Sequence, residues 1–170
     1  ASDLTRTYPV NGKFSPEQKI LYEIVLNTQL SCIDMIKPGV THQEVEDHAI
    51  LSLTEGLVGI GLLEGDVATL IAEKKYRKFY MHRVGHWIGL DVHDRGHYFI
   101  NNASRKLQPG MTMTVEPGLY VSPRTEGVDK KWWGIGIRIE DNIVVTEKGC
   151  RVLSAGLPKT VAEIESLMNE

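Results

Sequence analysis

The chain has 170 residues, of which 42% are hydrophobic and 24% are charged, and its formal net charge is -3. This length is enough to bury a core without disulfide or metal staples, so we expect one globular domain spanning residues 1–170. The slightly negative charge gives no attraction to nucleic acid or membrane surfaces, and the longest apolar run, residues 56–63, is too short to cross a bilayer, so we expect neither partner.

The two cysteines, Cys32 and Cys150, lie far apart and lack the spacing of metal ligands. We interpret them as buried or half-buried thiols of a reducing compartment, which favours a cytoplasmic location. No signal peptide is visible. The sequence begins Ala1-Ser2 without a methionine and enters strand-like residues at once, so we expect a fragment or a processed product whose first element is incomplete.

The N-terminal part is predicted to be one strand followed by helices. Residues 3–10 alternate β-branched or aromatic with polar residues and end at the turn signal Asn11-Gly12, which predicts a strand. Ser15-Pro16-Glu17-Gln18 forms a capping box with proline at the first helical position, and the helix it opens should end at Lys37-Pro38-Gly39. Thr41-His42-Gln43-Glu44 is a second capping box and opens a second helix.

The second helix is expected to loosen at residues 56–65, a glycine-spaced apolar connector. Asp66 can cap a short helix that reaches about residue 74. His42 and His48 are interpreted as cap or surface residues of the second helix rather than ligands. Four basic residues are interpreted as a solvated helix end: Lys74, Lys75, Arg77 and Lys78.

The C-terminal part is predicted to be mostly β. The strand candidates, chosen for alternation or β-branched content, are residues 111–116, 119–121, 135–140 and 143–146. Thr160 caps a last helix whose apolar face holds Ile164, Leu167 and Met168. Because no repeat or low-complexity linker interrupts the chain, the sequence predicts a single α+β domain.

Three of the six histidines fall within Met81-His-Arg-Val-Gly-His-Trp-Ile-Gly-Leu-Asp-Val-His-Asp94. A helical zinc-protease pair is disfavoured, because Arg83 stands where that motif has glutamate and two glycines weaken a helix there. An extended segment fits better and places His82 and His86 on the same side of the chain. A fourth histidine, His97, is interpreted as an exposed loop residue.

Glu116 and Glu140 each close an apolar strand. A carboxylate on an inward face loses several kcal/mol of solvation unless something neutralises it, and a metal cation is one solution. The other solution is that the carboxylate pairs with Arg138 or stays in solvent at the end of its strand. For either acid taken alone, the sequence favours this second interpretation.

Four motifs taken together change that balance: residues 3–14, residues 81–94, residues 107–111 with 115–120, and residues 134–141. In this order they resemble the metal-site motifs of the Xaa-Pro aminopeptidases, specifically aminopeptidase P. The resemblance implies the pita-bread fold of the creatinase/methionine aminopeptidase type. The block from His86 to Asp94 is similar to the proline-directed branch rather than to methionine aminopeptidases, and a prolidase acting on Xaa-Pro dipeptides remains open within that branch.

The resemblance implies a metallo-aminopeptidase that removes the residue before a proline in second position, through a hydroxide bridging two metal ions. Asp3 and Glu140 match the bridging carboxylates, and His86 and Glu116 match the other ligands of the first ion. Glu116 would also carry the proton to the leaving proline nitrogen.

Four further residues match positions around the bound peptide: His82, His93, Arg138 and Tyr120. Among them His93 is expected at the scissile region and His82 at the wall that accepts proline. Catalytic roles are therefore expected for His82, His93 and Arg138 beside Glu116. The substrate partner is a peptide with an Xaa-Pro N-terminus, and a full-length form could be a homo-oligomer.

A carboxylate-rich site with a single imidazole suits Mn²⁺ first, with Co²⁺, Fe²⁺ or Zn²⁺ as other candidates. The family's pattern has a further aspartate upstream of Asp3, as well as an upstream histidine and a separate N-terminal domain, none of which this sequence contains. We therefore expect residues 1–170 to hold at most one ion well and to cleave peptides weakly or not at all. A non-catalytic pita-bread module that binds peptides or proteins is the alternative from another functional class.

Overall fold

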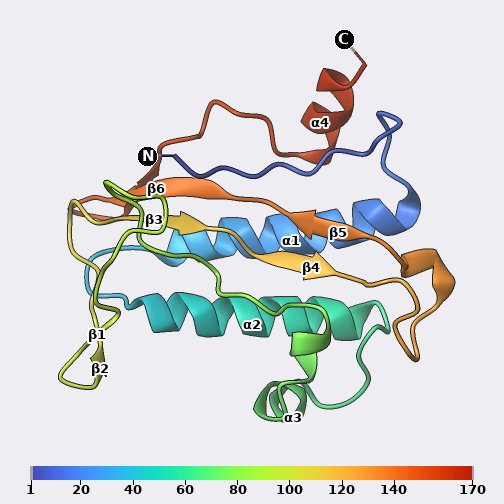
Figure 1. The fold of residues 1–170 in the computed structure, drawn as a ribbon, viewed down its shortest axis with the longest axis horizontal. Helices are drawn as coiled ribbons and strands as arrows, with labels where there is room; N and C mark the ends of the chain where they lie inside the picture. Colours follow the sequence, from blue (N-terminus) through green and yellow to red (C-terminus); the bar gives the residue numbers. More distant parts are fainter. Residues whose placement is uncertain (1, 170) are drawn as a thin grey trace.

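The computed structural model describes residues 2–169 and has two long helices, one passing behind the strands and the other lying next to it (Figure 1). Helix α1 (Pro16–Met35) and helix α2 (His42–Gly59) pack side by side and run in opposite directions. Each begins at its predicted capping box, in which the Ser15 or Thr41 hydroxyl and the third helical side chain satisfy backbone N–H groups reciprocally. Both predicted helix starts are confirmed.

Helix α2 extends further than predicted, because Gly56 and Gly59 are helical rather than part of a connector. A Cβ added at Gly56 would lie 2.5 Å from Cγ2 of Ile24 on α1. The glycine therefore allows the two helices to approach closely, and this packing outweighs the low helix propensity of glycine.

The shorter elements are α3 (Val67–Ala72), the 3₁₀ turns η1 (Lys75–Lys78) and η2 (Lys130–Trp132), and α4 (Val161–Leu167). The caps predicted at Asp66 and Thr160 are confirmed. All four basic residues of the predicted solvated helix end are exposed. A small hairpin of β1 (Phe99–Ile100) and β2 (Ala103–Ser104) was not predicted.

The remaining strands are β3 (Thr112–Val115), β4 (Gly118–Tyr120), β5 (Gly136–Arg138), β6 (Asp141–Val145) and β7 (Cys150–Val152). They form an antiparallel sheet of order β3-β6-β7 and an antiparallel pair β4-β5. Of these, β7 was not predicted, and the predicted strand 135–140 is shorter in the structure.

The two ladders follow a single register, in which Val115 faces Asp141 and Gly118 faces Arg138. Between them the pairing is interrupted where Pro117 has no N–H to donate. The same register places Glu116 directly opposite Glu140. Two carboxylates opposite each other on adjacent strands repel unless a cation lies between them.

Residues 84–88 of the histidine-rich stretch are extended, as predicted, and lie along the edge of β3 that faces away from β6. Val84 and His86 accept backbone hydrogen bonds from Glu116 and Thr114 at 2.7 and 2.9 Å, and the Ile88 N–H donates to Thr112 at 3.3 Å. An isolated bridge between Trp87 and Met113 continues the same pairing. The helical alternative for this segment is therefore wrong.

Gly85 makes this close pairing with β3 possible, because a Cβ there would lie 2.0 Å from the Thr114 carbonyl oxygen. We expect Gly85→Ala to lower the free energy of unfolding by about 3 kcal/mol, since a backbone atom cannot move aside as a side chain can. Gly59→Ala is the matched control: a Cβ there meets nothing within 4 Å, and alanine should raise helix stability by about 0.5 kcal/mol. Urea unfolding measures both, and a Gly85→Ala protein as stable as the wild type would contradict the pairing.

The strand predicted for residues 3–10 is wrong, because the structure describes no strand in residues 2–10. The segment instead runs alongside β5 and β6 as an irregular extended chain (Figure 1). Its backbone contact is the Thr5 carbonyl, which accepts from the Glu140 N–H at 3.0 Å. A side chain replaces the next rung of a ladder: Thr7 Oγ1 accepts from the Arg138 N–H at 3.1 Å, while Pro9 has no N–H to offer.

Two hydrophobic clusters hold the site in place. The larger packs α1, α2 and α4 against β4 and β5, with Leu21, Leu53, Leu119 and Ile164 at its centre. The other packs the opposite ends of α1 and α2 against β3 and β6 and contains the buried Cys32. Cys150 is half-buried, and both thiols are free, as predicted. Among the described residues, no helix has the length and apolarity needed to span a membrane.

Candidate metal centre

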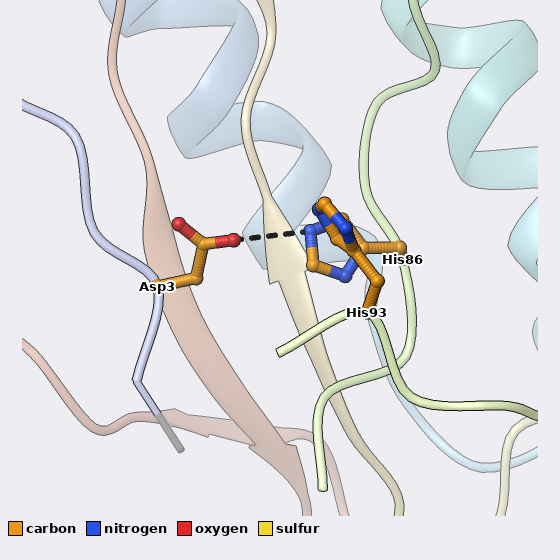
Figure 2. A group of neighbouring side chains, drawn as sticks. All are labelled: Asp3, His86 and His93. Carbon is orange, nitrogen blue, oxygen red and sulfur yellow. Dashed lines mark ion pairs between the residues drawn. The ribbon is translucent and has the colours of Figure 1, made fainter. Parts of the chain in front are cut away.

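Ligand-type side chains converge at the interruption between the two ladders. Figure 2 shows Asp3, from the N-terminal segment, facing His86. The His86 Nε2 atom lies 3.3 Å from Asp3 Oδ2 and 3.2 Å from Glu116 Oε1. His86 Nδ1 lies 3.0 Å from the Trp87 carbonyl oxygen. Because a carbonyl only accepts, Nδ1 of a neutral imidazole carries the proton and Nε2 turns its lone pair toward the carboxylates.

Thr114 orients two of these side chains at once. Its Oγ1 accepts from the His86 N–H at 3.0 Å and donates to Glu116 Oε1 at 3.0 Å. The residue is fully buried. Sequence reasoning missed this role, although residues 112, 114 and 116 alternate on one face of the predicted strand, and that pattern was the available signal.

Glu140 is the most buried acid of the group, with 1% of its surface exposed. Thr5 Oγ1 donates to its Oε2 at 2.6 Å, whereas its buried Oε1 has no hydrogen-bond partner among the described residues. Burial raises the pKa of Glu140 to about 7, opposed by the Thr5 hydrogen bond and reinforced by the nearby Glu116 and Asp3. A buried carboxylate oxygen without a partner is costly unless a ligand satisfies it.

These residues fit a divalent cation. The ligand atoms of His86, Glu116 and Glu140 all lie within 4.8 Å of one another, and the same holds for Asp3, His86 and His93. A cation placed among them would take up the unpartnered Glu140 oxygen and the Nε2 lone pair, and it would relieve the repulsion between the facing carboxylates. All four predicted metal ligands are thus brought together by the fold.

His93, predicted to contact substrate, is exposed and lies against His86, with ring centroids 4.5 Å apart in an edge-on arrangement (Figure 2). The structure therefore places it within reach of the metal ligands and exposed to solvent. Its assignment to substrate rather than metal stays a prediction.

The other predicted substrate residues gather around β4 and β5. His82 Nε2 lies 2.8 Å from the Tyr120 hydroxyl, and His82 Nδ1 lies 2.8 Å from the Arg83 carbonyl. The Arg83 carbonyl can only accept, so the bond at Nδ1 is one in which the ring donates. Burial raises the pKa of Tyr120, and the nearby Arg138 guanidinium opposes that shift. Arg138 Nε also donates to Thr5 Oγ1 at 3.2 Å.

The histidines interpreted as bystanders have different surroundings. His97 is exposed, as predicted. His48 lies on α2 with Nε2 2.9 Å from Ser31 Oγ. The interpretation of His42 as a surface residue is wrong: it is 4% exposed, its Nε2 lies 2.9 Å from the Gly85 carbonyl, and burial lowers its pKa. His42 thus supports the backbone that precedes His86, a long-range contact that its helical position did not indicate.

Comparison with known proteins places this arrangement in a family. The model of metallopeptidase family M24 matches residues 1–147. The chain belongs to this family. M24 membership implies the use of a divalent metal, in agreement with the converging ligands.

The M24 chain has close relatives among known proteins. It is 50% identical to the Xaa-Pro aminopeptidase of Haemophilus influenzae over 169 residues, which is 99% of this chain and 39% of that protein. Its fold superposes on Pseudomonas aeruginosa aminopeptidase PepP with a TM-score of 0.97 at 56% identity, covering 99% of this chain and 38% of the other. The structure of Escherichia coli aminopeptidase P with the inhibitor Pro-Leu superposes with a TM-score of 0.93 at 48% identity, and the match covers 98% of this chain and 38% of the other. The predicted pita-bread fold is confirmed, and the M24 chain spans less than half the length of these relatives.

Proposed function

We propose that this chain carries the metal site of a metallo-aminopeptidase that removes the N-terminal residue from peptides with proline in second position. The observation that carries the proposal is the convergence of His86 Nε2 with the Glu116 and Glu140 carboxylates around an unpartnered buried oxygen. The proline preference is supported by the relatives, which are Xaa-Pro aminopeptidases, and by the E. coli protein's inhibitor Pro-Leu.

The metal would be held by Asp3, His86, Glu116 and Glu140, a ligand set with three carboxylates and one imidazole. We propose Mn²⁺ as the ion, with Co²⁺, Fe²⁺ or Zn²⁺ as substitutes, because oxygen-rich sites favour hard to intermediate cations. When bound, the ion supplies Lewis-acid polarisation of the peptide carbonyl and stabilises the negative charge that develops there. For residues 1–170 we propose one equivalent of metal.

The side chains divide the remaining work. Glu116, placed beside His86 and oriented by Thr114, takes a proton from the attacking water and delivers it to the leaving proline nitrogen. His82 lies edge-on to the rings of Tyr80 and Tyr120, with centroids 5.0 and 5.4 Å away. Tyr80 is buried behind His82, whereas His82 and Tyr120 are half-buried and would form the wall that accepts the proline side chain. His93 would contact the scissile region of the peptide, and Arg138 would contact the bound peptide nearby.

A chimera tests this function. Residues 2–169 would replace the matched segment of the H. influenzae relative, and the Mn²⁺-loaded product would be assayed for release of alanine. We expect cleavage of Ala-Pro-Leu at least about 10-fold faster than cleavage of Ala-Ala-Leu, because a proline-shaped wall discriminates by contact. A folded, metal-loaded chimera that cleaves neither peptide would overturn the proposal, and a preference for the dipeptide Ala-Pro would indicate a prolidase. The unmodified relative is the control.

We also propose a cytoplasmic location. The free thiols of Cys32 and Cys150 support it, since free cysteines persist in a reducing compartment. Fluorescence microscopy of a tagged protein measures it, and a signal confined to the cell envelope would contradict it.

A further inference from the structure

A buried polar cluster adjoins the metal site through the residue that follows Glu140. Asp141 is fully buried. Its Oδ1 accepts from Arg6 Nη2 at 2.7 Å and from Ser154 Oγ at 2.6 Å. Its Oδ2 accepts from Gln29 Nε2 and Lys159 Nζ, both at 2.7 Å. We call these five residues the Asp141 cluster: Arg6, Gln29, Asp141, Ser154 and Lys159.

Within the Asp141 cluster, Arg6 touches both the segment that carries Asp3 and the backbone of Glu140, and Asp3 and Glu140 are two of the proposed metal ligands. Its side chain is 5% exposed. Nη1 donates to the Glu140 carbonyl at 2.6 Å and to the Thr5 carbonyl at 3.1 Å, while Nε donates to the Pro158 carbonyl at 2.9 Å. One planar guanidinium therefore links the backbone next to Glu140 with the N-terminal segment that bears Asp3, and Asp141 fixes its orientation.

The segment that carries Asp3 needs such a link, because it has no strand ladder. Among the described residues, its other polar ties to the core include the contact of Asp3 with His86, the contacts of Thr5 with Glu140 and Arg138, and the contacts of Thr7 with Arg138. Lys159 differs from Arg6 in this respect. It contacts the same Asp141 carboxylate at the same 2.7 Å, but its other side-chain bond goes to Gln29.

We propose that Arg6 is a positioning residue for the metal site: held by Asp141, it sets the spacing between Asp3 and Glu140 and thereby the affinity for the metal. The proposal rests on the proposed function in so far as Asp3 and Glu140 are taken as ligands. The Asp141 cluster then aligns two chain segments that lie far apart in sequence, in addition to stabilising the fold.

Electrostatics and positioning predict opposite effects of removing Arg6. The Arg6 guanidinium repels a divalent cation. If Coulomb repulsion were its only effect, removing the guanidinium should strengthen metal binding. Loss of alignment should weaken it instead, because ligands held less firmly must be ordered by the metal itself. A fall in affinity is therefore specific to positioning.

The test compares Arg6→Met with Lys159→Met in the 170-residue chain. Each variant removes one positively charged side chain that pairs with the Asp141 carboxylate at 2.7 Å. We expect the Kd for Mn²⁺, measured from the electron paramagnetic resonance of free Mn²⁺, to rise about 10- to 100-fold in Arg6→Met. In Lys159→Met it should stay within about twofold of the wild type, since the screened charge effect is small. The visible spectrum of bound Co²⁺ should change in Arg6→Met alone.

The measured Kd values distinguish the positioning role of Arg6 from the proposed metal site itself. Wild-type Kd values in Arg6→Met, or an equal loss of affinity in Lys159→Met, would overturn the positioning role while leaving the metal site intact. A wild-type chain that binds no Mn²⁺ would instead overturn the proposed function. If Arg6→Met does not fold, Arg6→Lys replaces it: lysine keeps the charge but cannot form the fork, so its Kd should also rise, and an unchanged Kd overturns the proposal.

Discussion

Replacing His86 by alanine should abolish metal binding, whereas the same change at His93 should leave binding intact. His86 is half-buried, its backbone is paired with β3, and its Nε2 faces two carboxylates. Loss of a residue that merely orients a ligand costs about 10- to 100-fold in metal affinity, so loss of this ligand should exceed about 100-fold. His93 is exposed on a loop and can turn away without disturbing the carboxylates.

Calorimetric titration with Mn²⁺ measures both variants, and circular dichroism shows whether each remains folded. In the chimera with the H. influenzae relative, His93→Ala should remove peptide cleavage although the metal is retained. The second possible ligand group, Asp3 with His86 and His93, supplies the competing expectation. If His93→Ala loses the metal as completely as His86→Ala, His93 is a ligand and its assignment to substrate is wrong.

The helix starts could be predicted from the sequence because a capping box is a local device. Ser15 with Gln18, Thr41 with Glu44 and Thr160 with Glu163 each satisfy N–H groups within one turn, so three residues of context are enough. The end of α2 could not be predicted in the same way. Gly56 is helical because Ile24, on another helix, packs against it.

The acids of the site illustrate the same limit. Each of Glu116 and Glu140 could be placed at a strand end from its own segment, but their facing arrangement depends on a register set between segments far apart in sequence. Only the resemblance of the combined motifs to aminopeptidase P indicated that they act together. The fold then confirms their proximity, while their individual roles stay predictions.

Residues that position the ligands were not predicted at all. Thr114, Arg6 and Asp141 have side chains that read as ordinary strand or surface residues in sequence, and their importance comes from contacts across the fold. The strand predicted for residues 3–10 was wrong because local propensity was outweighed by contacts across the fold. Its residues have β propensity, but side-chain hydrogen bonds from Thr5 and Thr7 take the place of a ladder.

Glu140 should make the stability of the metal-free chain depend on pH, and bound metal should remove that dependence. Burial, with Glu116 and Asp3 nearby, raises its pKa from 4.5 to about 7. In the metal-free folded chain the carboxyl therefore keeps its proton to higher pH than in the unfolded chain. Its stabilising contribution is fully present below the unfolded pKa and is lost as the pH rises through 7, up to about 3 kcal/mol in all.

Metal binding offsets this dependence, because the ion and the proton compete for the same carboxylate and the affinity for the ion rises as the proton is lost. Below pH 7 the affinity for Mn²⁺ should fall about tenfold per pH unit from this group alone. Thermal unfolding between about pH 5.5 and 8.5, with and without MnCl₂, measures both effects. The metal-free midpoint should fall with rising pH, and the stabilisation by Mn²⁺ should grow. Glu140→Gln removes the titrating group and should flatten the metal-free trend; a trend that persists unchanged in this variant would show that another group controls it.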